Sequence, residues 1–505
     1  MKIFLSLFIV CVSTIVVAQK KPNVVMIISD DHAYQTISAY GSKLMNTPNI
    51  DRIANEGARF DKAYVTNSIC GPSRAVILTG KYSHKNGFKD NENSRFDGSQ
   101  DSFIKQLTRN GYNTAWIGKW HLESTPEGFS YYNILQGQGQ YYNSNFISEK
   151  EGLHIKNGYV ANVIEDEAEK WLDERDTTKP FCLVIGHKNT HRAWIPDLQD
   201  MGEFDDREFP LPANFYDNYT GRKAAEIQDM TISKTMVMGY DLKMFQTKEA
   251  ADMEGSVKRM TADQRAKYDA YYDPIRKDFF SKKLSGNELT EWRFQRYMKD
   301  YLATARSLDR NIGRTLDYLD RNNLAENTLV IYISDQGFYM GEHGWFDKRF
   351  MYEESFRTPM MMRWPGVIKP GSTFNDFVMN LDIGPTILDA ASVPVPEDMQ
   401  GRSILPVIKK EFNRDAMYYH YYEKGEHNVS PHFGIRTNRY KLIRFYDKVN
   451  AWELFDLKND PREIHNLYGQ KKLATITKNL SAQLEQLIKK YEDDEALEIL
   501  KSSIK

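Results

Sequence analysis

Two pairs of side chains with ligand oxygens each follow a run of apolar residues in this sequence. One pair is Asp30 and Asp31, and the other is Asp335 and Gln336. Adjacent carboxylates at the end of a buried strand lose hydration and repel each other unless a cation or hydrogen-bond donors neutralise them. Carboxylate and amide oxygens favour calcium or magnesium. The pairs therefore predict a metal site, although aspartates that cap a strand-to-helix turn would also explain the first pair.

Cys70 needs a chemical explanation of its own. The sequence has three cysteines, and Cys11 lies in an apolar N-terminal segment that we expect to be removed. The remaining Cys70 and Cys182 do not amount to a disulfide framework. Cys182 lies inside an apolar run and is interpreted as a small buried hydrophobe. Cys70 is the first residue of the segment Cys-Gly-Pro-Ser-Arg. From these residues alone, the segment could be either a structural loop or a reactive site.

Four apolar runs predict the strands that would position these side chains. They cover residues 23–28, 114–118, 181–185 and 328–333, and polar residues follow each of them. A continuous apolar run is typical of a parallel strand that is covered on both faces. Helical spacing of apolar residues appears between the runs, at 102–110 and 291–322. Alternating strands and helices indicate an α/β doubly wound sheet, whose ligands gather outside the carboxyl ends of the strands.

The chain of 505 residues has room for one large domain and a smaller one. We expect a catalytic domain over 19–400, with an insertion of loops and helices at about 196–289. Residues 401–505 are expected to form a C-terminal subdomain. Its short alternating segments predict a small antiparallel sheet, at 433–437, 440–444 and 452–457. A charged amphipathic helix at about 473–491 is expected to close the chain.

Residues 1–18 have the pattern of a secretory signal peptide. Lys2 precedes a mostly apolar run, and small residues end it before Gln19. The run is short for a membrane span, so we expect an exported protein, periplasmic or secreted, without stable membrane insertion after the signal is removed. The 67 Lys and Arg residues against 69 Asp and Glu leave a formal charge of -2, which provides no field to attract nucleic acid. An anionic substrate must be bound by a local site.

The segment that begins at Cys70 also points to a family. The run Cys70-x-Pro72-Ser73-Arg74, followed by Thr79-Gly80, resembles the signature of the type I sulfatases of the alkaline-phosphatase-like superfamily. Further blocks follow in the family's order, namely 119–121, 186–196, 334–337, 341–344 with Lys348, and 452–467. The resemblance implies an α/β fold with a large mixed, mostly parallel sheet between helices, and a smaller C-terminal antiparallel-sheet subdomain with a helix.

The resemblance also implies the cofactors. In this family a maturation enzyme converts the cysteine to formylglycine, and one Ca2+ is bound per chain. Carried over position by position, the implied calcium ligands are Asp30, Asp31, Asp335, Gln336 and the modified Cys70. Gln336 departs from the family pattern, which most often has Asn or His there, and its longer side chain leaves direct coordination in doubt.

The resemblance implies catalytic roles for six residues, which are Cys70, Arg74, Lys119, His121, His191 and Lys348. Cys70 gives the nucleophile, and Arg74 holds it together with the metal-binding carboxylates. Lys119 and Lys348 contact sulfate. His121 acts on the hydroxyl whose deprotonation releases sulfate, and His191 protonates the leaving alcohol. Other residues could line the pocket or serve only the structure, namely His187, Glu342, His343, Glu353, Arg357 and the aromatic residues Tyr131, Tyr132, Tyr141, Tyr142 and Trp194.

These residue types suit the cleavage of a sulfate ester. Such a site must supply a nucleophile, cations for the sulfate oxygens and an acid for the leaving alcohol. A hydrated formylglycine carries two hydroxyls on one carbon, so one can attack sulfur while the other later loses a proton and expels sulfate. Serine or cysteine cannot make that second move. The implied maturation enzyme is therefore a required partner of the chain.

Two other functions remain open on the sequence alone. One is a phosphate or phosphonate ester hydrolase of the same superfamily, and the other is a carbohydrate-binding relative that has lost catalysis. The expected substrate is a sulfated polysaccharide or its oligosaccharides, such as ulvan, carrageenan or glycosaminoglycan. The blocks around Gln336 and Lys348 are most similar to those of bacterial polysaccharide sulfatases and glucosamine-6-sulfatase-like members.

Overall fold

A ten-stranded sheet forms the centre of the molecule in the computed structural model, which describes residues 21–411 and 413–502. Its strand order is β11-β2-β10-β9-β1-β8-β4-β5-β6-β7. The middle strands run parallel, and they are β9 (Thr328–Ser334), β1 (Asn23–Ser29), β8 (Phe181–Gly186), β4 (Asn113–Gly118) and β5 (Tyr131–Leu135). The four predicted strands are therefore adjacent, so their carboxyl ends meet at one edge of the sheet.

The outer strands make the sheet mixed. On one side β10 (Met360–Arg363) pairs antiparallel with β9 and with β2 (Ala58–Phe60), which pairs in parallel with β11 (Ser372–Phe374). On the other side β6 (Asn145–Ser148) and β7 (Gly152–Ile155) continue antiparallel from β5. The expected large, mixed and mostly parallel sheet is confirmed.

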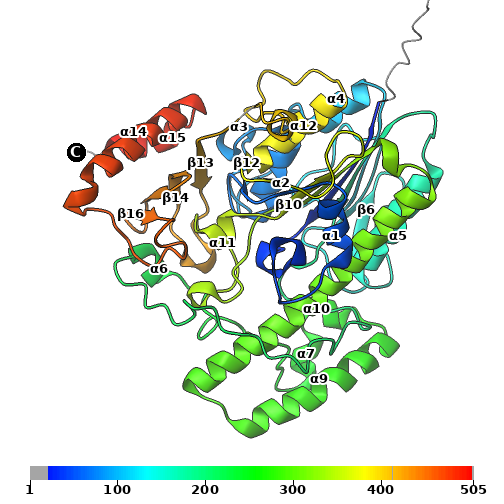
Figure 1. Cartoon of the computed structure of the whole chain (residues 1–505). Helices are drawn as coiled ribbons and strands as arrows, with labels where there is room; N and C mark the ends of the chain where they lie inside the picture. Colours follow the sequence, from blue (N-terminus) through cyan, green and yellow to red (C-terminus); the bar gives the residue numbers. More distant parts are fainter. Residues whose placement is uncertain (1–20, 412, 503–505) are drawn as a thin grey trace, which may run out of the picture.

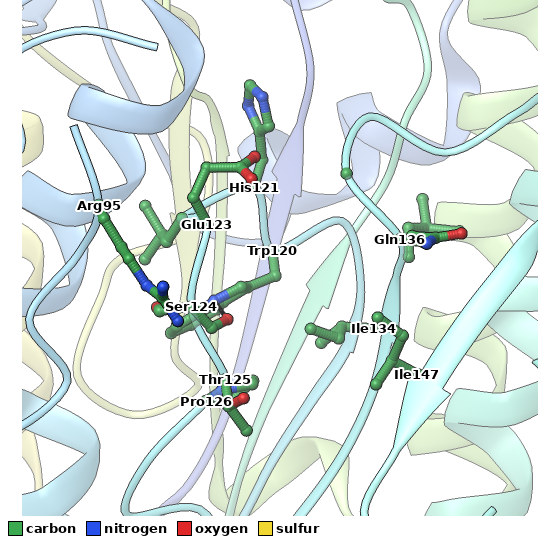
Figure 2. Close-up of a pocket in the computed structure, with 13 residues that line it drawn as sticks. Arg95, Trp120, His121, Glu123, Ser124, Thr125, Pro126, Ile134, Gln136 and Ile147 are labelled. Atoms are coloured by element: carbon green, nitrogen blue, oxygen red, sulfur yellow. Dashed lines mark hydrogen bonds between the residues drawn. The ribbon is translucent and has the colours of Figure 1, made fainter. Parts of the chain in front are cut away.

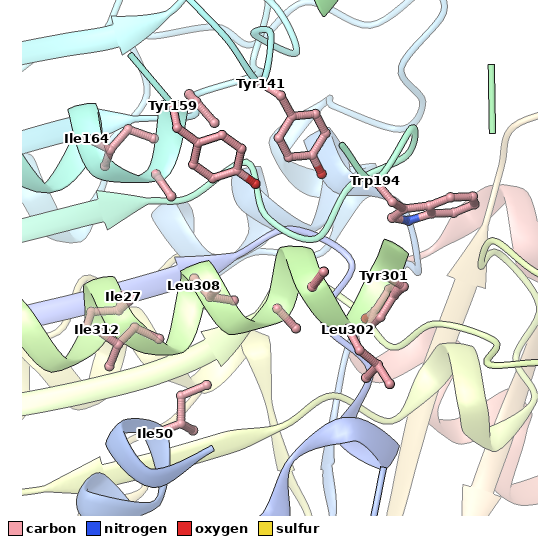
Figure 3. Close-up of a cluster of buried hydrophobic side chains, with 14 of the residues drawn as sticks. Ile27, Ile50, Tyr141, Tyr159, Ile164, Trp194, Tyr301, Leu302, Leu308 and Ile312 are labelled. Atoms are coloured by element: carbon pink, nitrogen blue, oxygen red, sulfur yellow. The ribbon is translucent and has the colours of Figure 1, made fainter. Parts of the chain in front are cut away.

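Helices cover both faces of this sheet, and β1 shows why. Its side chains alternate between faces, so that Val25 and Ile27 belong to one apolar cluster while Val24 and Met26 belong to another. The first cluster packs under α1 (Pro48–Asn55), α5 (Val160–Glu174) and α10 (Gly286–Arg321), and Figure 3 shows Leu308 and Ile312 of α10 beside Ile27. The second lies under α2 (Cys70–Thr79), α4 (Phe103–Arg109) and α12 (Ile383–Ala390).

Between β8 and β9 the chain forms helices and loops only, within the part that the structure describes. The helices before α10 are α6 (Lys223–Ile227), α7 (Lys248–Asp252), α8 (Gly255–Lys258) and α9 (Ala262–Lys282). In Figure 1, α9 and the beginning of α10 project together from the body of the molecule. The domain boundaries and the limits of the insertion stay predictions.

A second sheet follows the main one. It contains β13 (Ala416–Tyr421), β14 (His432–Thr437), β15 (Tyr440–Phe445) and β16 (Ala451–Asp456) in antiparallel order. The helix predicted at about 473–491 is confirmed as α14 (Ala474–Lys490), but it does not close the chain, because α15 (Asp494–Ser502) follows it. Glu492 has a φ of 59°, which breaks the helix, and the Asp493 carboxylate accepts a hydrogen bond of 3.1 Å from the Ala496 N–H. Among residues 21–411 and 413–502, no helix is both long and apolar enough to cross a membrane.

Gly118, the last residue of β4, holds the backbone of the following Lys119 close to β8. Its φ is 94°, and a Cβ there would lie 2.1 Å from the Gly186 carbonyl oxygen. We expect Gly118→Ala to lower the free energy of unfolding by at least about 3 kcal/mol, because strain and a backbone clash add. The control is Gly111→Ala, since Gly111 has a φ of 84° but no atom within 4 Å of the added Cβ. In urea unfolding, Gly111→Ala should lower the free energy of unfolding by only about 1 kcal/mol. Equal losses in the two variants would contradict the explanation that a Cβ at Gly118 clashes with the Gly186 carbonyl.

Candidate active site

The edge where the parallel strands end gathers the polar residues singled out by the sequence. Asp30 and Asp31 follow β1, Lys119 follows β4 and Asp335 follows β9, and all of them are buried. Cys70 begins α2, and its side chain is 1% exposed. Residues that are far apart in the chain therefore meet in one site, as the strand pattern predicts.

A group of potential metal ligands occupies the middle of this site. One ligand atom each from Asp30, Asp31, Cys70 and His191 lie within 4.8 Å of one another. Asp335 is held against the group, because its Oδ1 accepts a hydrogen bond of 3.1 Å from the Asp31 N–H. The carboxylates of Asp30 and Asp31 are thus close enough to share a cation, and Asp335 is tied to them through the Asp31 backbone. The grouping fits a divalent metal ion with oxygen ligands.

Gln336 also reaches this group. Its Nε2 donates to the Asp31 carboxylate and lies 3.7 Å from the Cys70 sulfur. Among the side chains of this group, the buried oxygens Gln336 Oε1 and Asp30 Oδ1 have no hydrogen-bond partner. Buried acceptors without a donor are costly, and a cation would satisfy both. The donor set therefore fits Ca2+, and Gln336 is placed where turning its amide over would bring the oxygen to the ion in place of Nε2.

Each of the three carboxylates has a basic partner. Arg74 Nε donates a hydrogen bond of 2.9 Å to Asp335 Oδ2, and the Arg74 guanidinium forms a buried ion pair with the same carboxylate. Lys348 Nζ lies 2.7 Å from Asp31 Oδ2. Lys119 forms a buried ion pair with Asp30 and also donates to the Gln138 side chain. A sulfate group entering this site would meet these same cations.

Burial and neighbouring charges shift the pKa values of the three carboxyl groups in different directions. Burial alone would raise the pKa of Asp30, but the nearby Lys119 and other cations hold it well below its usual value. Burial raises the pKa of Asp31 to about 6 against the effect of Lys348. Burial and the charge of Asp30 raise the pKa of Asp335 to about 7. In the absence of a metal ion, the site therefore holds more protons near neutral pH than free aspartates would.

The residues of the cysteine motif lie on the single helix α2. The Ser73 hydroxyl donates to the Asp335 backbone carbonyl and accepts a hydrogen bond of 2.9 Å from Asn380 Nδ2. Gly80 ends the helix in the left-handed conformation, with a φ of 64°. The motif thus serves two purposes, since it places Cys70 and Arg74 in the site and fixes α2 to the end of β9.

The unmodified thiol of Cys70 is poorly suited to attack. Burial raises its pKa above that of a free cysteine, and the negative charge of Asp30 raises it further. The thiolate is the nucleophilic form, so this thiol would be protonated and inert at neutral pH. A reactive Cys70 therefore needs either a bound cation or a chemical change at its side chain.

Two histidines of the site differ in their surroundings, namely His191, which belongs to the group of potential ligands, and His121. His191 Nδ1 is 2.6 Å from the Arg192 carbonyl, which leaves Nε2 directed to the site, 4.0 Å from Asp31 Oδ2. His121 is buried with its Nδ1 unpartnered. Burial lowers the pKa of both, so both are neutral without substrate. His187 is fully buried and neither ring nitrogen has a hydrogen bond, which favours the structural one of the two roles left open by the sequence.

Several residues that the sequence offered as pocket lining are engaged in the structure instead. Trp194 is fully buried against Tyr297, so it cannot stack on a sugar. His343 is 2.6 Å from the Asp217 carboxylate, and Glu353 pairs with Lys441 at 3.0 Å. Glu342, in turn, accepts a hydrogen bond from Gln35. These residues hold loops together rather than face a ligand.

A charged cluster beside Lys348 was missed by the sequence reading. Asp347 lies 3.1 Å from Arg349 Nη1 and 3.1 Å from His427 Nε2, and its Oδ1 is 3.8 Å from Lys348 Nζ. Arg192, bound to Asp241, reaches the same His427 at 3.5 Å. Asp347 and Arg349 flank Lys348 in the sequence, and this proximity could have identified them as site residues. No feature of the sequence identified His427 as one. Lys188 and Gln138 were missed as well.

A cavity of about 270 Å3 borders the loop that carries His121 (Figure 2). The figure shows the His121 ring at one end, with Arg95 and Ser124 on one wall and Ile134 and Ile147 on the other. Trp120 lies between the walls. Of the residues assigned to the site, His121 is the one that lines this cavity, so the cavity borders the site on the side of His121.

The chain matches known proteins along most of its length. The family model "Sulfatase" matches residues 22–393, and the model "N-sulphoglucosamine sulphohydrolase, C-terminal" matches residues 341–490. An N-acetylglucosamine-6-O-sulfatase of Bacteroides thetaiotaomicron is 46% identical over 94% of this chain and 88% of its own length. An arylsulfatase of Clostridium perfringens is 26% identical over 94% of this chain and 97% of its own length.

A solved structure agrees with these matches. It is described as a complex with its substrate D-glucosamine-2-N,6-O-disulfate, and it superimposes with a TM-score of 0.91 at 46% identity, covering 94% of this chain and 99% of that one. The expected α/β fold and the expected sulfuric ester hydrolase are confirmed. The chain belongs to the sulfatase family, within the alkaline-phosphatase-like superfamily.

Proposed function

We propose that this sulfatase removes the 6-O-sulfate from glucosamine residues of glycosaminoglycan oligosaccharides. The observation that carries the proposal is the 46% identity, over nearly the whole chain, to a protein named N-acetylglucosamine-6-O-sulfatase. The relatives named as ulvan-active sulfatases share only 25% and 26% identity with this chain. A glucosamine sulfate is therefore favoured over an algal polymer.

The cluster beside Lys348 supports a sugar substrate. Asp347, Arg349 and His427 bring a carboxylate, a guanidinium and an imidazole to one place, all at least nine-tenths buried by side chain. Charged groups of this kind bind ring hydroxyls through short hydrogen bonds. Since Lys348 pairs with Asp31 in the metal group, the cluster would hold a sugar ring whose sulfate reaches Cys70.

We further propose that Cys70 carries formylglycine and that Asp30, Asp31, Asp335 and Gln336 hold Ca2+. The ion would supply a positive charge that favours the ionised nucleophile and the sulfate oxygens. Formylglycine would supply, when hydrated, a hydroxyl nucleophile that the buried thiol cannot. The support is the Cys-x-Pro-Ser-Arg motif at the start of α2 and the unpartnered oxygens of Asp30 and Gln336.

The chain's own residues then have distinct tasks. Lys119 and Lys348 neutralise the sulfate oxygens, and Arg74 fixes Asp335 beside the nucleophile. His191 directs Nε2 to the site, where it can give a proton to the departing sugar oxygen. His121, with a free Nδ1, can accept the proton whose removal releases sulfate. His121 is already in the neutral form that a proton acceptor needs. His191 can donate a proton near neutral pH only when the incoming anion offsets the cost of charging its ring.

Sulfate release from a panel of sugars tests the proposal. We expect the mature enzyme to release sulfate from N-acetylglucosamine 6-sulfate and from N-sulfoglucosamine 6-sulfate, measured by ion chromatography. Galactosamine 4-sulfate and 6-sulfate and ulvan oligosaccharides should react at least about a hundredfold more slowly, because misplaced ring hydroxyls leave buried polar groups unpaired. Faster release from ulvan or from galactosamine would overturn the proposed substrate.

Export and maturation complete the proposal. Residues 1–18, interpreted as a signal peptide, lie outside the described residues, and we propose that the protein acts in the periplasm or outside the cell. Its proposed partners are the sulfated saccharide and a formylglycine-generating enzyme. Protein made in a host without that enzyme should be folded but inactive.

Calcium binding should depend on pH. The metal-free protein has raised pKa values at Asp31, to about 6, and at Asp335, to about 7, so Ca2+ must displace protons at pH 5 but hardly at pH 7.5. These groups keep protons in the folded state that they lose when unfolded, so they destabilise the metal-free protein as pH rises through this range. We expect calcium affinity to rise by about 10²- to 10³-fold from pH 5 to pH 7.5, measured by titration calorimetry.

A buried carboxyl outside the site provides the control. Burial raises the pKa of Glu165 to about 8, and its Oε1 accepts a hydrogen bond of 2.7 Å from Thr315. Glu165→Gln should leave calcium affinity unchanged, whereas Asp31→Asn should weaken it by a factor on the order of a hundred. Equal calcium affinity at the two pH values would contradict the proposed ligands.

A further inference from the structure

Lys188 is a buried cation of the active site that has no anionic partner. The residue is only 4% exposed. Within the described part of the chain, its side-chain ammonium makes no hydrogen bond and no ion pair, and its recorded contact is with the Tyr141 ring. The other cations of the site are paired, Arg74 with Asp335, Lys119 with Asp30 and Lys348 with Asp31. An ammonium without a partner is costly to bury, so its position needs an explanation.

The surrounding chain holds Lys188 firmly in place. The Lys188 carbonyl accepts a hydrogen bond of 2.9 Å from the His191 N–H, and the next carbonyl, of Asn189, accepts one of 3.0 Å from the Asp30 N–H. Its Nζ lies 5.1 Å from the centroid of the Tyr141 ring, whose hydroxyl donates to the His191 carbonyl. The residue is therefore fixed to both the metal group and the histidine.

The Lys188 ammonium lies near enough to the charged groups of the active site for them to act on it. Its nitrogen is not fully enclosed, although the residue as a whole is only 4% exposed. The charge of Lys119 opposes the charged form of Lys188, whereas the carboxylates of Asp30 and Asp31 favour it. Burial, followed by Lys119, lowers its pKa to about 8, which still leaves it mostly charged at neutral pH.

We propose that Lys188 is a further substrate-contacting residue of this sulfatase, whose ammonium binds an anionic oxygen of the sulfate group that is transferred. The sulfate brings the negative charge that the protein does not provide to this lysine. The cost of burying the free ammonium is then recovered only when a sulfate ester is bound, which favours binding of an anion over a neutral sugar.

Inorganic sulfate is the probe that tests this, measured as a competitive inhibitor of the mature, calcium-loaded enzyme and by calorimetry. We expect Lys188→Met to weaken sulfate binding about tenfold or more and to raise KM, while Lys188→Arg stays within about threefold of the wild type. Unchanged sulfate affinity in Lys188→Met would overturn the proposal. So would a loss that Lys188→Arg does not restore.

Thermal unfolding separates this role from a structural one. Lys243 is the matched control, because it is equally buried but fully partnered, at 2.6 Å from the Ala193 carbonyl and 2.8 Å from the Trp194 carbonyl. Lys243→Met should lower the melting temperature, whereas Lys188→Met should leave it unchanged or raise it. A comparable fall in Lys188→Met would show a structural lysine and overturn the proposal.

The inference rests on sulfatase activity but not on the proposed sugar. If the wild-type enzyme releases no sulfate from glucosamine 6-sulfates, the proposed substrate fails, while calorimetry with inorganic sulfate still decides the role of Lys188. If the sugar reacts and the Lys188 variants bind sulfate like the wild type, only this inference fails.

Discussion

Replacing Cys70 by alanine is expected to abolish sulfate release, by a factor on the order of 10⁴ or more, while the melting temperature stays within about 2 °C of the wild type. The side chain is 1% exposed at the first turn of α2, and it shares the metal group with Asp30 and Asp31. Alanine removes the nucleophile but leaves every ion pair of the site in place. The measurement is kcat/KM on a glucosamine 6-sulfate.

The matched control is Cys182→Ala. Cys182 is the other buried cysteine among the described residues, and it lies in β8 within the apolar cluster under α2. That variant should lose a similar amount of stability, about 1 kcal/mol, and keep its turnover. Measurable activity in pure Cys70→Ala protein, above about 1% of the wild type, would contradict a nucleophile at this position.

Replacing His191 by alanine is expected to slow the enzyme by an amount that depends on the leaving group. On a sugar sulfate the loss should be about 10²- to 10⁴-fold, because an alcohol departs poorly without a proton. On an aryl sulfate with a nitrophenol leaving group the loss should be less than about tenfold, since that group departs as an anion. His191 is placed for this role, because the Arg192 carbonyl fixes Nδ1 and leaves Nε2 facing the site.

His187→Ala is the comparison for this experiment. His187 follows β8 as His191 does, but it is fully buried without a hydrogen bond to its ring. Its replacement should lower the melting temperature and affect both substrates alike. If His191→Ala lowered the rate by the same factor on the sugar sulfate and on the aryl sulfate, the assignment of His191 as the proton donor would be wrong.

Much of the core and the centre of the site could be predicted from the sequence. The four apolar runs have the continuous pattern of parallel strands, and they are adjacent in the sheet as β9, β1, β8 and β4. Because parallel strands end at one edge, the residues after each run had to meet. The cysteine motif added the start of α2, which brings Cys70 and Arg74 to the same edge.

Other parts depend on packing between distant segments, which local patterns do not reveal. His427 comes from the loop between β13 and β14, and only the folded chain brings it to 3.1 Å from Asp347. Trp194 could have faced a sugar by its position after His191, but its ring is buried against Tyr297. The helix break at Glu492 depends on one left-handed residue in a sequence with otherwise helical spacing.

Lys188 illustrates the same limit in the active site. In the sequence it is an ordinary lysine between two histidines, and lysines are mostly exposed. Only the structure shows that it is 4% exposed and lies 5.1 Å from the centroid of the Tyr141 ring, while the carboxylates nearby are already paired. A pattern of residue types cannot show which cation is left without an anion.

The most direct measurement of the central claim is mass spectrometry of the peptide that contains residue 70, combined with the specific activity of the same preparation. We predict a peptide in which sulfur and two hydrogens have been replaced by one oxygen, the composition of formylglycine. Specific activity should rise in proportion to the fraction of this peptide across preparations made with different amounts of maturation enzyme. Full activity in protein whose Cys70 is entirely unmodified would contradict the account.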